Sequence, residues 1–141
     1  MKGYRVRRPK EYEELLNLLR DKEAGVFLTL KSALVFSAAV GFKQKKRLEF
    51  SESSEPIVFT LFNDHQEKPF IYSLALTEFN DVTCLQEDGF VPMMKVFEEY
   101  AAGGLRYLDG VLDKANIKES IESILSESEG DDLIFNIADG W

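Results

Sequence analysis

The feature that most constrains the fold is the run from Ala33 to Phe42, in which every residue is apolar or small. Thr29 is a suitable N-cap, so we expect a helix that begins at Leu30. A run of this length is too short to span a bilayer, which needs about 20 apolar residues. A helix that is apolar nearly all round is a buried one. The run therefore predicts a core helix, or a helix shared between two subunits.

A run of cations follows this helix at once, formed by Lys43, Lys45, Lys46 and Arg47. Cations suit the negative end of a helix dipole, and their other use is contact with an anion. Residues 1–50 hold 12 Lys and Arg against 6 Asp and Glu, a net charge of +6, whereas residues 51–141 hold 5 against 19, a net charge of −14. Such a split favours nucleic-acid contact by the basic half or a separate task for the acidic half, and an ordinary uneven surface is the alternative.

The segments before the central helix predict a ribbon-helix-helix unit within the first 47 residues. Tyr4–Arg8 alternates as a short strand, and Lys10–Lys22 has the spacing of an amphipathic helix. A lone strand has unpaired edges, and pairing with its copy in a second subunit would make a ribbon that fits a DNA major groove, with Arg5 and Arg7 toward the bases. The alternative is that the strand pairs with the later sheet of its own chain.

The remainder predicts a small antiparallel sheet followed by helices, so the expected class is α+β. Two β-prone runs, Pro56–Phe62 and Pro69–Leu76, are typical of a hairpin. A helix from about Pro92 is expected to break at Gly103–Gly104 and resume, and Asn116 is expected to open a last helix. The predicted parts are a ribbon-helix-helix-like unit (1–47), a linker (48–55), the hairpin plus helices (56–128) and an acidic tail (129–141).

Few residues in the chain are suited to catalysis or to metal binding. There is one cysteine, Cys84, so no disulfide can form within the chain, and there is one histidine, His65, in a polar turn. A zinc site of four Cys or His ligands is therefore not expected. The weaker candidates for a metal are carboxylates beside the predicted hairpin, Asp64, Glu67, Glu78 and Asp81. We expect no cofactor, no enzymatic activity, no membrane segment and a cytoplasmic location.

Two blocks of the sequence resemble a known family. These are Phe27–Arg47, in which an Ala-Leu pair and small residues precede Gly-Phe and a basic cluster, and Phe97–Leu108, an acidic-aromatic helix that ends in Gly-Gly-Leu. In this order they are similar to the small proteins associated with DNA phosphorothioation, the Dnd system-associated protein 4 type. The resemblance implies an accessory role beside the machinery that adds sulfur to DNA and the linked restriction of foreign DNA. It implies no catalytic residues.

These patterns together predict a non-enzymatic accessory protein of DNA modification and restriction, with other proteins of that system as partners. We expect it to form a homodimer and to bind double-stranded DNA through its basic N-terminal part. The predicted contacts are Arg5, Arg7, Arg8, Lys31, Lys43, Lys45, Lys46 and Arg47. The alternative is a protein-interaction or regulatory module whose acidic C-terminal part binds a basic partner or covers its own basic half.

Overall fold

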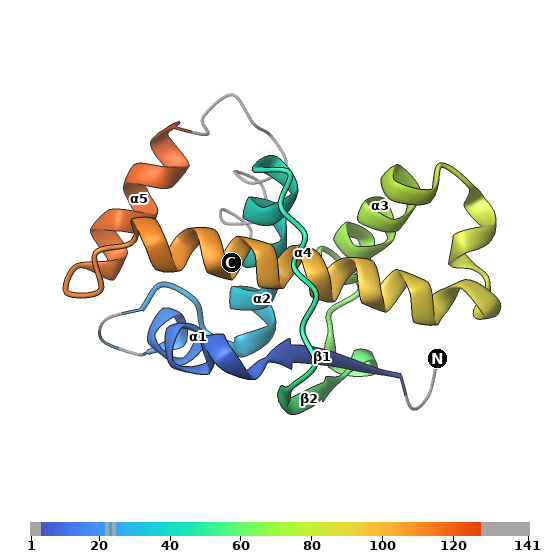
Figure 1. Ribbon diagram of the computed structural model, residues 1–141, viewed down its shortest axis with the longest axis horizontal. Coiled ribbons are helices and arrows are strands. Elements are labelled where there is room, and N and C mark those ends of the chain that lie inside the picture. The colour runs from blue at the N-terminus through green and yellow to red at the C-terminus, as the bar shows by residue number, and fades with distance from the viewer. Residues whose placement is uncertain (1–3, 22, 24, 128–141) are drawn as a thin grey trace.

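A computed structural model describes residues 4–21, 23 and 25–127 of the chain. The longest helix, α4 (Phe90–Val111), runs through the middle of the molecule, and α2 (Leu30–Lys43) crosses it (Figure 1). The strands β1 (Arg5–Pro9) and β2 (Ser53–Val58) lie on one side of α4, and α3 (Glu67–Phe79) packs beside it. The predicted α+β class is confirmed, because five helices accompany one two-stranded antiparallel sheet in the described part of the chain.

Helix α2 is the core helix that its apolar sequence predicts. The Thr29 hydroxyl accepts the Ser32 N–H at 3.1 Å, which caps the helix at the predicted residue. Every residue from Ser32 to Gly41 is buried within the chain itself. The burial of α2 therefore needs no second subunit.

Gly103 and Gly104 do not break a helix, and that prediction is wrong. Helix α4 is continuous across them. Gly104 packs against the backbone of α2, and Gly103 packs against the Lys46 carbonyl just beyond α2. A Cβ on Gly104 would lie 1.7 Å from the Ser37 carbonyl oxygen, and one on Gly41 would lie 2.0 Å from the Tyr100 carbonyl oxygen. The two helices thus touch backbone to backbone, which only residues without a side chain allow.

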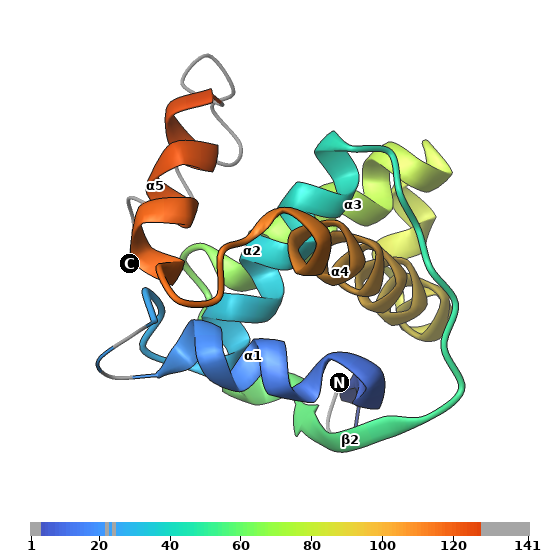
Figure 2. The same cartoon turned by 60° about the vertical axis from the view of Figure 1, so that its left-hand side comes forward.

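Helix α2 ends in a Schellman motif in which a lysine takes the place usual for glycine. The Lys46 N–H donates to the Gly41 carbonyl at 2.9 Å, and the Lys45 N–H donates to the Phe42 carbonyl at 3.1 Å. Lys45 has a φ of 56°, in the left-handed region that a side chain disfavours. The motif turns the chain out of α2 and directs residues 46–52, which we call the crossing segment, across the outside of α4, as Figures 1 and 2 both show.

We expect Lys45→Gly to raise the free energy of unfolding by about 1 kcal/mol, because glycine adopts this φ without steric cost. Urea denaturation followed by circular dichroism measures the change. Lys46→Gly is the matched control: it removes the same charge one residue further on, where φ is not positive, and should bring no gain. An equal effect of the two substitutions would contradict the strain at Lys45.

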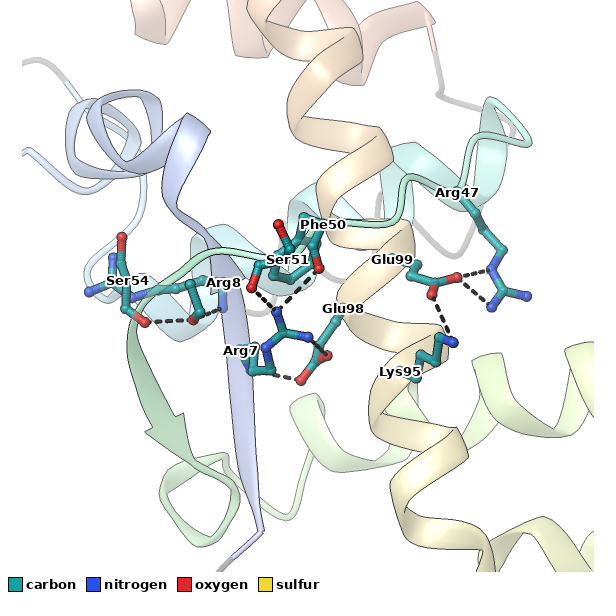
Figure 3. Close-up of polar contacts among 10 residues, drawn as sticks. Arg7, Arg8, Arg47, Phe50, Ser51, Ser54, Lys95, Glu98 and Glu99 are labelled. Carbon is teal, nitrogen blue, oxygen red and sulfur yellow. Dashed lines mark hydrogen bonds and ion pairs between the residues drawn. The ribbon is translucent and has the colours of Figure 1, made fainter.

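The N-terminal strand pairs within its own chain, so the ribbon-helix-helix prediction is wrong and the alternative is confirmed. β1 pairs with β2 of the same chain in antiparallel register, from Arg5 opposite Val58 to Pro9 opposite Ser53. The other side of β1 faces α4, and there the Arg7 N–H donates to the Glu98 carboxylate at 2.7 Å (Figure 3). The unpaired strand on which the predicted homodimer rested does not exist in this fold.

The predicted hairpin is also wrong, because Pro69–Leu76 lies in helix α3 and β2 ends at Val58 before the short 3-10 turn Phe59–Leu61. Pro69 falls in the first turn of α3, where its missing N–H costs nothing. The Asn63 side-chain oxygen accepts the N–H groups of Gln66 and Glu67 at 2.8 and 3.0 Å, which fixes the start of the helix. The buried residues of α3 then follow helical spacing: Phe70, Ile71, Leu74 and Ala75.

The remaining elements complete one hydrophobic core, whose residues run from Val6 to Ile121. The predicted first helix comprises the 3-10 turn Lys10–Tyr12 and α1 (Glu13–Arg20), and it buries its apolar face as expected. Two further 3-10 turns, η3 (Val82–Leu85) and η4 (Glu87–Gly89), join α3 to α4. The last helix, α5 (Ile117–Glu127), begins directly after Asn116, as predicted. The predicted acidic tail, residues 129–141, lies outside the described residues.

Candidate functional site around the buried acids of α4

The centre of α4 carries two adjacent buried carboxylates, Glu98 and Glu99, each only 6 % exposed. Burying a charge is costly unless it is paired and hydrogen-bonded. Both acids are partnered by arginines predicted to contact DNA: Arg7 reaches Glu98 from β1, and Arg47 reaches Glu99 from the chain beyond α2. Figure 3 shows these arginines on opposite sides of α4.

Arg7 contacts three segments of the chain and connects them. Its Nη2 donates to the Phe50 and Ser51 carbonyl oxygens at 3.2 and 2.9 Å. Its guanidinium lies 4.7 Å from the centre of the Phe50 ring, and its Nη1 lies 3.9 Å from Glu98 Oε1. Arg7 thus joins β1, the crossing segment and α4, with 41 % of its side chain still exposed.

Arg8 is buried, with 8 % exposure, on the β2 side of β1. Its Nε donates to the Glu55 carbonyl at 2.9 Å, and its Nη1 lies 3.9 Å from a carboxylate oxygen of Glu13. A guanidinium held in this way has little contact with solvent. Arg8 is therefore placed to stabilise the start of the fold rather than to reach a ligand.

Arg47 closes the basic run back onto α4. Its Nε and Nη2 donate to Glu99 Oε1 at 3.1 and 2.7 Å, and its Nη1 pairs with Glu78 of α3. The Tyr100 hydroxyl donates to the other Glu78 oxygen at 2.9 Å. Burial opposes the charge of Arg47, but the hydrogen bonds that it donates to the two carboxylates outweigh burial and raise the pKa of the guanidinium. This network joins α3, α4 and the exit of α2.

The other predicted DNA contacts do not form one surface. Lys31 donates to the Leu61 carbonyl at 2.8 Å. Arg5 is exposed in β1, whereas three exposed lysines, Lys43, Lys45 and Lys46, lie at the C-terminal end of α2. β1 and that end of α2 lie on opposite sides of α4 in both overall views (Figures 1 and 2). The structure therefore splits the predicted basic surface in two.

A groove of about 440 Å³ lies between β1, the crossing segment and α4. Arg5, Arg7 and Lys95 contribute cations to its lining, and Phe50 and Met94 contribute apolar surface. Burial raises the pKa of Glu98, also in the lining, to about 7, against the opposing hydrogen bond and charge of Arg7. Sequence analysis missed Glu98 and Glu99. Their one signal was an acidic pair inside an otherwise apolar helical face.

The predicted candidates for catalysis or metal binding are held apart by separate structural contacts. Asp64 pairs with Lys68 at 2.9 Å, and the Glu67 carboxylate accepts the Asn63 N–H at 2.7 Å. Glu78 belongs to the Arg47 network, and Asp81 accepts the Thr83 N–H at 2.9 Å. Among the described residues, no group of three or more His, Cys, Asp or Glu is placed to hold a metal ion.

The chain's thiol and imidazole stand in different surroundings. Cys84 is buried, and burial, with the charge of Asp81 beside it, raises the pKa of the thiol. A raised pKa disfavours the reactive thiolate. His65 is exposed in the loop before α3.

The part of the chain that the structure describes has no helix that is both long enough and apolar enough for a membrane span.

Comparison with known proteins decides the family. The model of the family described as DNA sulphur modification system-associated protein 4 matches residues 5–134. The chain belongs to this family. The match confirms the resemblance found in the sequence and associates the chain with a DNA sulphur modification system. Searches of curated proteins and of solved structures gave no match. For this system-associated protein, the match covers β1, the acidic pair of α4 and the basic run.

Proposed function

We propose that this chain is a non-enzymatic accessory protein of a DNA sulphur modification system and that it acts by binding other proteins of that system. The observation that carries the proposal is the use of the predicted DNA-contacting arginines. Arg7, Arg8 and Arg47 are all engaged by carbonyl and carboxylate groups of the chain itself. Arg7 connects β1, the crossing segment and α4; Arg8 connects β1 to β2 and α1; and Arg47 connects the exit of α2 to α3 and α4.

The overall charge supports the same proposal. Binding to duplex DNA draws most of its free energy from neutralised phosphates, so it requires a concentration of unpaired cations on one face. The chain has a net charge of −8, and its acids are concentrated in residues 51–141. A polyanion is repelled by such a field, whereas a basic protein is attracted to it.

Exposed apolar side chains provide surface that a protein partner could bury. Leu28 is 85 % exposed and Leu61 is 61 % exposed, and the Lys31 bond to the Leu61 carbonyl links the segments that carry them. Val82 and Val91 are 73 % and 65 % exposed near the junction of α3 and α4. The centres of protein interfaces are built from apolar side chains of this kind, with charged groups at the rim.

DNA contact is the second candidate, and the exposed lysines at the end of α2 favour it. Lys43 is the last residue of the helix, Lys45 and Lys46 lie just beyond it, and all three are exposed. Contacts from this short basic run would be electrostatic and would weaken steeply with salt. Such DNA contact would add to the binding of a protein partner and would not replace it.

We expect the purified chain to form a stable complex with at least one other protein of the system. The measurement is size-exclusion chromatography with light scattering on mixtures of the chain with each of those proteins in turn. Fluorescence anisotropy on duplex DNA should show little binding at about 200 mM salt. At about 50 mM salt, Arg7→Ala should leave any measurable DNA affinity unchanged. Absence of any protein complex, together with DNA binding that Lys45→Ala and Lys46→Ala weaken, would overturn the proposal in favour of DNA. The mass of the chain alone tests the homodimer expected from the sequence.

A further inference from the structure

A second cleft, of about 380 Å³, lies where α3 passes into α4. Phe79 at the end of α3, Cys84 of η3 and Pro92 of α4 give it apolar lining. Phe79 is 41 % exposed, and Val82, next to Asp81 of the lining, is 73 % exposed. The cleft belongs neither to the Arg7 groove nor to the Arg47 network.

The charged residues in the lining of this cleft are both acidic. Asp81 and Asp88 are in its lining, and both are exposed. The chain has no lysine or arginine between Lys68 and Lys95, whereas that stretch holds Asp81, Glu87 and Asp88 in addition to Glu78, which is paired with Arg47. The bond from the Thr83 N–H lowers the pKa of Asp81, so its carboxylate stays charged at neutral pH. A phosphate or an acidic segment is repelled here, and a cationic one is attracted.

The walls of the cleft are held in place by the turns that form it. The Cys84 N–H donates to the Asp81 carbonyl at 3.1 Å, and the Gly89 N–H donates to the Gln86 carbonyl at 2.8 Å. A Cβ on Gly89 would lie 2.3 Å from the Cys84 carbonyl oxygen, so η3 and η4 are in backbone contact. The cleft is therefore formed before any partner arrives, which lowers the entropic cost of binding.

We propose that this cleft binds a basic segment of a partner protein, with an apolar side chain over Phe79 and Val82 and a lysine or arginine paired with each of Asp81 and Asp88. The proposal rests on the protein-binding function proposed above and gives it a location and a partner chemistry. Apolar lining supplies the buried contact, and the acids at the rim supply attraction and orientation.

The test uses the full chain and each of the other proteins of the system, purified separately, in isothermal titration calorimetry. The charge variant is Asp81→Asn with Asp88→Asn, because asparagine keeps the capping bond to Thr83. The apolar variant is Phe79→Ser, because Phe79 is an exposed apolar residue of the lining. The matched control is Glu14→Gln with Glu119→Gln, which removes two exposed acids elsewhere. We expect each cleft variant to weaken binding at least about tenfold, or 1.4 kcal/mol, and the control to change it less than about twofold.

Hydrogen exchange gives a second readout that does not depend on the variants folding perfectly. In the complex, amides of residues 79–91 should exchange more slowly than in the free chain. Circular dichroism and the melting temperature of each variant show whether the fold is kept.

Each failure has its own signature. If the wild-type chain binds no protein of the system, the proposed function falls. If it binds one, and the cleft variants bind as tightly as the control, the cleft assignment falls while the function stands. Loss of binding only in Leu28→Ser with Leu61→Ser places the interface elsewhere and also overturns the cleft. If the wild-type chain self-associates and the charge variant does not, the cleft binds a second copy of the chain, and the proposed partner is wrong.

Discussion

Gly104→Ala is expected to lower the free energy of unfolding by about 3 kcal/mol or more, at the upper end of the cost of overpacking. The new methyl group would meet the Ser37 carbonyl oxygen at 1.7 Å and its carbon at 2.6 Å. Both atoms belong to the backbone of the buried stretch of α2, so no side chain can turn aside to make room. Helices α2 and α4 would have to separate, and the tight packing around their crossing would be lost.

Gly110→Ala is the matched control, because Gly110 lies in the same helix and a Cβ there meets nothing within 4 Å. It should stabilise the protein by about 0.5 to 1 kcal/mol, the usual gain when alanine replaces glycine inside a helix. Urea denaturation of both variants, followed by circular dichroism at one temperature, gives the comparison. A Gly104→Ala variant within about 1 kcal/mol of the wild type would show that the helices do not touch at this point.

The elements that sequence analysis predicted correctly are those whose local pattern has one physical reading. The run Ala33–Phe42 is apolar on all sides, and Thr29 has a side chain that caps a helix, so α2 and its first residue followed directly. Tyr12, Leu15, Leu16 and Leu19 share a face at helical spacing and are all buried. Each of these signals needs only neighbouring residues to be interpreted.

The errors arose where a local pattern fits two structures. A proline before apolar residues suits the start of a strand or the first turn of a helix, and at Pro69 the contacts of Asn63 and Glu67 decide for the helix. Gly103–Gly104 suits a break or a close crossing, and only the presence of α2 opposite distinguishes them. The strand at Tyr4–Arg8 was located correctly, but its partner lies more than forty residues away in β2.

The candidate site shows the same limit for charged residues. Arg7, Arg8 and Arg47 were singled out because cations attract anions, and each does contact oxygen atoms. Those oxygens belong to the chain, on Phe50, Ser51, Glu55, Glu78 and Glu99. No local rule assigns an arginine to an acceptor that is tens of residues away. Only the tertiary structure shows which oxygen atoms an arginine contacts. Those contacts distinguish an arginine that stabilises the fold from one that binds a ligand.

Glu98→Gln is expected to change how stability depends on pH. Burial raises the pKa of Glu98 in the folded chain to about 7, from an ordinary value of 4.5. Between these values the folded state holds a proton that the unfolded state has released, so this group lowers the free energy of unfolding as pH rises from about 4.5 to about 7. At 1.36 kcal/mol per pKa unit, the loss is about 3 kcal/mol, and it is complete above pH 7.

Glutamine removes this term and keeps a side-chain oxygen for the Arg7 N–H. The variant should therefore gain stability relative to the wild type as pH rises from about 5 to about 8, by about 3 kcal/mol in total. Taking the difference between the two proteins at each pH cancels the carboxylates that they share, including Asp64 and Asp81, whose lowered pKa values act in the opposite direction at lower pH. Glu49→Gln, which removes an exposed carboxylate from the same groove, is the control and should follow the wild-type profile. Parallel curves for Glu98→Gln and the wild type across this range would mean that Glu98 is solvated or fully paired with Arg7, and that the acids of α4 impose no cost on the fold at neutral pH.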